Sequence, residues 1–179
     1  MSDFLKNINP SWTLFLDRDG VINERLIDDY IKRWDEFVFL PGVLESLALF
    51  SDLFGRIIIV TNQQGVGKGW MDETQLKEIN HKMVAEIKSV GGRVDAVYYC
   101  TDLKEKPENC RKPSITMFEW AKRDFSEIDP ARSIMVGDSQ SDIDFGRMAG
   151  MYTVFIGGEN NTANVCFNNL KEFTNGTIS

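Results

Sequence analysis

Short apolar runs recur along the chain, and each one is followed by polar residues or glycine. Leu14-Phe15-Leu16 ends abruptly at Asp17, and Ile57-Ile58-Ile59-Val60 ends at Thr61. Runs of this length between turn residues are typical of strands buried on both faces of a parallel sheet. The pattern predicts five strands, at residues 13–17, 57–61, 94–100, 134–136 and 152–156.

The segments between these strands carry apolar residues at helical spacing. The longest has Leu76, Ile79, Met83 and Ile87 on one stripe, with Asp72 as a suitable N-terminal cap. Helices are predicted at residues 43–53, 72–90, 114–125 and 141–149. Because strands and helices alternate four times, we expect an α/β fold: a single domain spanning residues 1–179, with a Rossmann-like, doubly wound parallel sheet.

Both ends of the chain are poorly patterned. Residues 1–11 are expected to form a polar lead-in, and the Asn-rich tail after Glu159 suggests only a short helix at residues 170–173.

Composition narrows the classes of function. The 179 residues are 42% hydrophobic with a net charge of −7, which disfavours a general nucleic-acid binder or a protein of anionic membrane surfaces. No apolar stretch approaches the roughly 18 residues of a membrane span, and no signal-peptide pattern precedes Trp12. We therefore expect a cytoplasmic protein. The only histidine, His81, falls off the apolar stripe of its helix and is expected on the surface.

Polar residues at the strand ends point to one site. The carboxyl ends of parallel strands meet at the ligand crevice of such a sheet. Asp17 and Asp19 lie two residues apart, and carboxylates so close repel each other unless a cation or a shared proton relieves them. Oxygen ligands of this kind suit Mg²⁺, and phosphoryl transfer needs a nucleophile, cations and a proton relay. The residues expected to converge are Asp17, Asp19, Thr61, Lys112 and Asp138, with Asp142 as an outer support.

Four motifs in order resemble the haloacid dehalogenase-like (HAD) superfamily of phosphohydrolases. They are Asp17-Arg18-Asp19-Gly20-Val21, Thr61 after an apolar strand, Lys112 before Pro113, and Gly137-Asp138-Ser139-Gln140-Ser141-Asp142. The resemblance covers residues 12–157.

The resemblance implies a role for each motif residue. Asp17 would be the nucleophile and Asp19 the general acid and base. Mg²⁺ would be held by the Asp17 carboxylate, the Asp19 backbone carbonyl and the Asp138 carboxylate, with Asp142 in support. The residues expected to bind the phosphate or substrate are Thr61, Asn62, Gln63, Arg111 and Lys112.

Finer features are similar to one branch, the heptose 1,7-bisphosphate and histidinol-phosphate phosphatases. The short spacing between motifs leaves no room for a large cap domain, so loops 24–37, 64–71 and 101–111 should wall the pocket. Arg111 on the pocket rim would face a second phosphate, as would Lys68, Lys32 and Arg33 on the other wall loops, and this favours a heptose bisphosphate over histidinol phosphate. Other classes remain open: a phospho-acceptor domain and a non-hydrolytic sugar-phosphate binding module. We expect a monomer whose partner is a small phosphorylated molecule.

The loop before Arg111 departs from that branch, whose members usually carry a zinc loop of Cys-x-His and Cys-x-Cys. Cys100 and Cys110 match the outer cysteines, but Asp102 and Glu108 stand in place of the other ligands. Structural zinc prefers closed sets of Cys and His, so we expect no zinc. Three cysteines are an odd number and too sparse for a disulfide scaffold, so we expect Cys100 and Cys110 to be reduced thiols.

Overall fold

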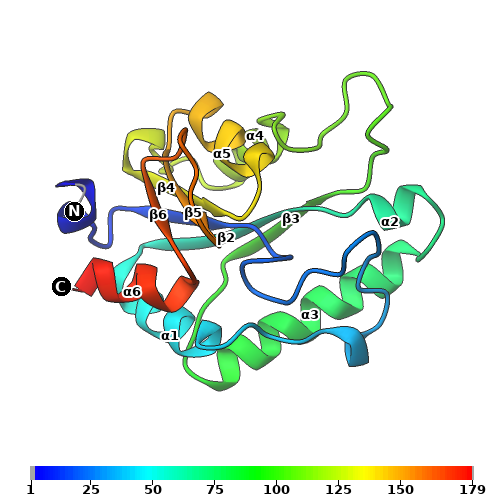
Figure 1. The fold of residues 1–179 in the computed structure, drawn as a ribbon, viewed down its shortest axis with the longest axis horizontal. Helices are drawn as coiled ribbons and strands as arrows, with labels where there is room; N and C mark the ends of the chain where they lie inside the picture. The colour runs from blue at the N-terminus through cyan, green and yellow to red at the C-terminus, as the bar shows by residue number, and fades with distance from the viewer. Residues whose placement is uncertain (1–2, 179) are drawn as a thin grey trace.

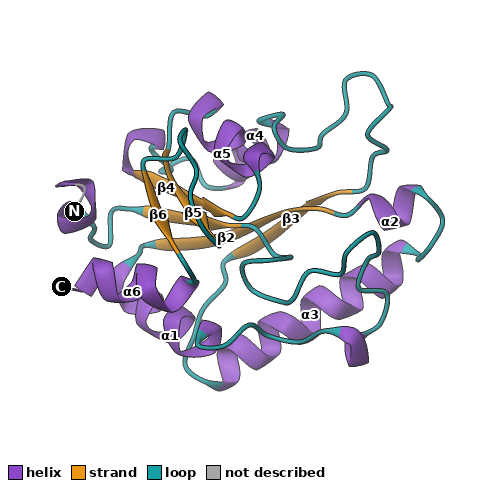
Figure 2. Cartoon of the chain, viewed as in Figure 1, coloured by secondary structure: helices purple, strands orange, loops and turns teal. Residues whose placement is uncertain are grey.

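The computed structural model of the protein describes residues 3–178, and its centre is a six-stranded parallel sheet (Figure 2). The strands are ordered β3-β2-β1-β4-β5-β6. The strand order reverses at β1 and β4, the position at which open α/β sheets bind their ligands. The strands are β1 (Thr13–Leu16), β2 (Arg56–Asn62), β3 (Ala96–Cys100), β4 (Ser133–Gly137), β5 (Tyr152–Ile156) and β6 (Val165–Phe167).

Helices cover both faces of this sheet (Figure 1). One face carries α1 (Val43–Leu53), α3 (Glu73–Ser89) and α6 (Leu170–Ile178), and the other carries α4 (Thr116–Asp124) and α5 (Gln140–Met148). The expected doubly wound fold is confirmed. Among residues 3–178, no helix has the length and apolarity that crossing a membrane requires.

The two faces of the sheet bury two hydrophobic clusters. On β1, Leu14 and Leu16 join the cluster under α1 and α3, whereas Phe15 joins the cluster under α4 and α5. Successive side chains of a strand point to opposite faces, so a run of apolar residues serves both clusters. This is why the strands are continuously apolar in sequence.

The loops beyond the strand ends hold only short helical pieces. The segment from β1 to α1 contains the 3-10 helix η2 (Trp34–Glu36), and that from β2 to α3 contains the four-residue α2 (Gln64–Gly67). No large cap is inserted within the described part of the chain, as expected.

The largest departures from the sequence prediction are at the two ends. The lead-in was expected to be polar, but it contains the 3-10 helix η1 (Asp3–Asn7), with Phe4 buried and stacked on Tyr152. The tail adds a sixth strand, β6, at the sheet edge, and its helix α6 runs on to Ile178. Two further short pieces of the chain are α2 and the 3-10 helix η3 (Pro130–Arg132).

Candidate active site

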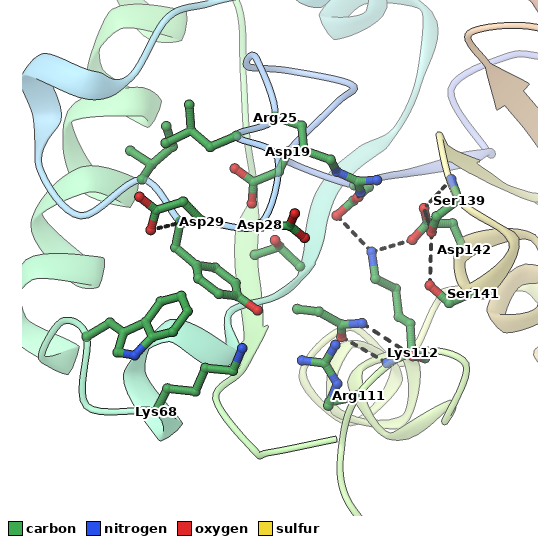
Figure 3. A pocket seen from close by; sticks show the side chains of 17 residues that line it. Asp19, Arg25, Asp28, Asp29, Lys68, Arg111, Lys112, Ser139, Ser141 and Asp142 are labelled. Carbon is green, nitrogen blue, oxygen red and sulfur yellow. Dashed lines mark hydrogen bonds and ion pairs between the residues drawn. The ribbon is translucent and has the colours of Figure 1, made fainter. Parts of the chain in front are cut away.

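The carboxyl ends of β1, β2 and β4 open into a cavity of about 620 Å³. The loop from β1 to α1, the segment around α2 and the loop before α4 supply its walls (Figure 3). The lining includes Asp17, Asp19, Thr61, Asn62, Arg111, Lys112 and Asp142. Sequence elements far apart in the chain therefore converge on one cavity, as the topology predicts.

Lys112 is the central cation of the cavity, and it is buried. Its Nζ donates to Asp17 Oδ1 at 2.8 Å and to the Val60 carbonyl at 2.7 Å. It also forms an ion pair with Asp142 Oδ1 at 2.6 Å. Burial alone would lower the pKa of Lys112, but the charges of Asp142 and Asp17 outweigh it and raise that pKa. Lys112 thus stays charged beside the Asp17 carboxylate.

Burial raises the pKa values of Asp17 and Asp138. Burial, with the charge of Asp142 added, raises the pKa of Asp17 to about 7, although Lys112 opposes the shift. Burial raises the pKa of Asp138 to about 6 against the opposing charge of Arg25. Burial therefore disfavours the charged form of both carboxyl groups, and a cation bound between them would favour it.

The donor set of this cluster suits a hard divalent cation. Carboxylate oxygens of Asp17, Asp138 and Asp142 all lie within 4.8 Å of one another. Asp142 is partly committed elsewhere, because its Oδ2 accepts from Ser139 Oγ at 2.6 Å and caps α5. Mg²⁺ prefers one or two carboxylates together with water and phosphate oxygens, so Asp17 and Asp138 fit it.

Asp19 lies in a different environment from Asp17. Its carboxylate accepts hydrogen bonds from Arg18 at 3.1 Å, Asn23 at 2.9 Å and Gln63 at 2.6 Å. Burial would raise the pKa of Asp19, but the Arg18 charge and these hydrogen bonds hold it below its usual value. Arg18 is itself fully buried and reaches Asn80 of α3 at 3.1 Å. The Asp19 carboxylate is therefore fixed by donors from several segments.

Asn62 and Gln63, both expected to bind phosphate, hold other site residues in this structure. Asn62 Oδ1 accepts from the Lys112 backbone N–H at 2.9 Å, and its Nδ2 donates to the Lys112 carbonyl at 3.3 Å. Gln63 Nε2 donates to both Asp19 and Thr61 Oγ1. Asn62 therefore fixes the end of β2 against the segment that carries Lys112, and Gln63 links the end of β2 to Asp19.

The outer cavity wall is cationic and aromatic. Lys68 Nζ lies 4.5 Å from the Trp70 ring centroid and 5.7 Å from that of Tyr30. Arg111 also lines the cavity, and its Nη1 is buried with no hydrogen-bond partner within residues 3–178. Unpaired buried donors are rare in proteins, so Arg111 is free to receive an anionic ligand.

Arg25 is a site residue that the sequence did not reveal. It comes from the loop after β1, and its guanidinium lies 2.8 Å from Asp138 Oδ1 and 3.7 Å from Asp17 Oδ2. The loop is rich in charges of both signs and shows no periodic pattern, so nothing in the sequence separates Arg25 from its neighbours.

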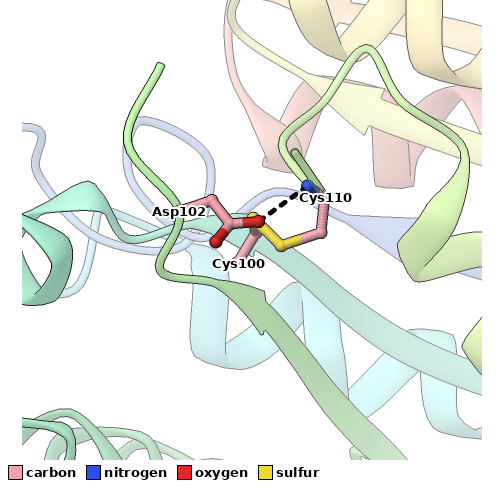
Figure 4. Close-up of side chains that lie close together, drawn as sticks. All are labelled: Cys100, Asp102 and Cys110. Carbon is pink, nitrogen blue, oxygen red and sulfur yellow. Dashed lines mark hydrogen bonds between the residues drawn. A yellow bond between two sulfur atoms is a disulfide. The ribbon is translucent and has the colours of Figure 1, made fainter. Parts of the chain in front are cut away.

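The expectation of reduced thiols at Cys100 and Cys110 is wrong. The two residues form a disulfide that closes the loop before Arg111 (Figure 4). Asp102 Oδ2 accepts from the Cys110 backbone N–H at 3.1 Å, which ties the loop further. Cysteine count alone could not show that the ends of this loop meet. Cys166 is the free cysteine and it is exposed.

Comparisons with known proteins agree with this geometry. The HAD-hydrolase-like family model matches residues 109–168. The D-glycero-alpha-D-manno-heptose-1,7-bisphosphate 7-phosphatase of Mycobacterium bovis is 35% identical over 90% of this chain and 89% of its own length. The D-glycero-beta-D-manno-heptose-1,7-bisphosphate 7-phosphatase of Haemophilus ducreyi is 35% identical over 78% of this chain and 79% of its own length.

A solved structure is also similar to this chain. It is the D,D-heptose 1,7-bisphosphate phosphatase of B. bronchiseptica, complexed with magnesium and phosphate. The TM-score is 0.84 at 28% identity, covering 93% of this chain and 98% of that one.

Proposed function

Because this chain belongs to the haloacid dehalogenase-like hydrolase family and is a phosphoric monoester hydrolase, we propose that it removes one phosphate from a heptose 1,7-bisphosphate. The reaction is Mg²⁺-dependent and passes through a phosphorylated Asp17. The observation that carries the proposal is the cavity whose lining joins Asp17, Lys112 and Arg111, with a carboxylate oxygen of Asp138 within 4.8 Å of one of Asp17.

The chain's own residues supply both chemical steps. A carboxylate oxygen of Asp17 attacks phosphorus and the bond to the sugar oxygen breaks. Asp19, whose hydrogen bonds favour the ionised form, must first take a proton from solvent, and it gives that proton to the sugar oxygen. Water then attacks the aspartyl phosphate, Asp19 takes the proton of the water, and free phosphate leaves with Asp17 restored. Thr61 and Lys112 bind the phosphoryl oxygens, and Lys112 does so by exchanging one of its three contacts for one to the phosphoryl group.

Mg²⁺ held by the carboxylates of Asp17 and Asp138 and the backbone carbonyl of Asp19 would neutralise charge on the transferred group. The neighbour whose solved structure contains magnesium and phosphate supports this cofactor.

The second phosphate of the substrate calls for cations away from Lys112. Arg111 has an unpaired buried Nη1, and Lys68 lies on the aromatic wall formed with Tyr30 and Trp70. Charge-assisted hydrogen bonds of arginine to phosphate are among the strong polar contacts of proteins. We propose that both cations bind the phosphate that is not removed.

Histidinol phosphate is the second candidate substrate. Asp28 lines the same cavity and would suit the amino group of that molecule (Figure 3). The curated relatives favour the heptose bisphosphate.

Substrate comparison tests the proposal. We expect a higher kcat/KM for heptose 1,7-bisphosphate than for histidinol phosphate in the presence of Mg²⁺. Arg111→Gln should lower kcat/KM on the bisphosphate by about 10- to 100-fold, the value of a charged hydrogen bond, and leave a simple aryl phosphate almost unaffected. Lys104→Gln, an exposed cation of the same loop, is the matched control.

Two results would overturn the substrate assignment. One is a preference for histidinol phosphate, and the other is an equal loss on both kinds of substrate in the Arg111 variant.

A further inference from the structure

The guanidinium of Arg25 contacts two carboxylates, those of Asp17 and Asp138. The proposed function assigns the same two carboxylates to the metal ion. Asp17 follows β1 and Asp138 follows β4, and Arg25 reaches both from the long loop between β1 and α1. The Arg25 side chain is 45% exposed, whereas those of Asp17 and Asp138 are 6% and 16% exposed. A half-exposed cation thus contacts two carboxylates that are mostly buried.

The other cation of the cluster cannot replace Arg25. Lys112 is engaged by Asp17, Asp142 and the Val60 carbonyl, which match the three donors of its ammonium group. Asp138 is left with Arg25 as its ion-pair partner among the described residues. Without Arg25, a mostly buried carboxylate would face two others with no cation of its own, an arrangement that is unfavourable.

We propose that Arg25 is a built-in counter-ion that competes with Mg²⁺ for Asp17 and Asp138. In the metal-free protein the guanidinium relieves the repulsion between these carboxylates. When the metal binds, the guanidinium withdraws, which its exposed side chain allows by rotation without a movement of the buried strands. Arg25 therefore sets how tightly the site holds its metal. This inference rests on the proposed function only for the identity of the two metal carboxylates.

If Arg25 competes with the metal, its removal should raise the affinity for Mg²⁺ and lower the stability of the metal-free protein. Removing Arg25 takes a stabilising contact from the metal-free protein and removes a competitor of the metal. A residue with a purely structural role would instead lower the stability of the metal-free and metal-bound proteins alike, and would leave metal affinity unchanged or weaker.

Calorimetric titration of MgCl2 into the chelator-treated full chain tests the proposal, at constant ionic strength and without substrate. We expect Arg25→Gln to bind Mg²⁺ about tenfold more tightly than the unmodified protein, the size of a partly buried ion pair. The same variant should have a lower Tm in chelator, and the difference should shrink in saturating Mg²⁺. Arg33→Gln is the matched control, because it removes the same charge from the same loop, where Arg33 pairs with Asp35.

Equal or weaker Mg²⁺ binding by Arg25→Gln would overturn the competition. So would an equal tightening in the Arg33→Gln control, because general charge would then explain it. If the unmodified protein binds no Mg²⁺ at all, the metal site of the proposed function fails as well, so the two failures are distinguishable.

Discussion

Asp17 and Asp19 are two residues apart in the chain and are in opposite electrostatic environments. Burial raises the pKa of Asp17 to about 7, whereas the Arg18 charge holds the pKa of Asp19 below its usual value. The difference comes from their partners: Asp17 shares Lys112 with Asp142, but Asp19 has a buried arginine and two amide donors. One motif thereby places two buried carboxylates in different environments.

Asp19→Asn is expected to damage turnover far more than metal binding. Its carboxylate is directed to Arg18, Asn23 and Gln63 and not to the cluster of Asp17. Loss of the proton relay should lower kcat by about 10²–10⁴-fold. Calorimetric titration with Mg²⁺ should give an affinity within a few fold of the unmodified protein. Loss of Mg²⁺ affinity with unchanged single-turnover chemistry would show that the role is wrong.

For single residues, the sequence predicted which charged side chains lie in the site better than it predicted the residues that contact them. Asp17, Asp138 and Lys112 follow or flank recognisable elements, so topology brings them together. Arg25 and the pairing of Asn62 with the Lys112 backbone depend on how irregular loops fold, and no periodicity encodes that.

Among the elements, α3 is the best predicted from sequence. Its apolar stripe faces the sheet, and Asp72 and Gln75 form a reciprocal capping box at its start. Strand β6 has three residues, and its central Cys166 is exposed at the sheet edge. Its short apolar signal is lost within an Asn-rich tail, so the sequence did not predict it.

The loop between β3 and α4 is the element whose chemistry the sequence misjudged. The disulfide joins cysteines separated by 10 residues, and closing a loop of this size stabilises a protein by about 2–3 kcal/mol. We expect the Cys100→Ser, Cys110→Ser double variant to unfold about 5–10 °C lower than the unmodified protein. Thiol titration of the denatured protein should find the Cys166 thiol alone before reduction.

The matched control is Cys166→Ser, which should leave the Tm nearly unchanged. A full set of three free thiols in the unreduced protein would contradict the disulfide.

We also still expect no stoichiometric zinc, because Asp102 and Glu108 replace Cys or His ligands. About one tightly held zinc per chain by elemental analysis would contradict that expectation.

For the whole molecule, both hydrophobic clusters are built on the same strands. Phe15 belongs to one cluster and its neighbours Leu14 and Leu16 to the other, so neither cluster can separate without breaking β1. The alternation of strands and helices was sufficient to predict this architecture from sequence, because right-handed crossovers leave few other arrangements.

Shared strands predict one cooperative unfolding transition. Far-UV circular dichroism and tryptophan fluorescence should follow the same curve in denaturant. The midpoint should not depend on protein concentration, as expected of a monomer. Two separate transitions would contradict the single domain, and a concentration-dependent midpoint would contradict the monomer.

The central claim is that Asp17 is the nucleophile of a phosphatase, and one rate comparison tests it most directly. Phosphate release from heptose 1,7-bisphosphate in saturating Mg²⁺ is measured for the unmodified protein and for Asp17→Asn, with the Tm of both recorded to verify folding. The account predicts that kcat falls by at least about 10³-fold, because the variant lacks both the attacking carboxylate and a metal ligand. A folded Asp17→Asn variant that releases phosphate at a near-normal rate would contradict it.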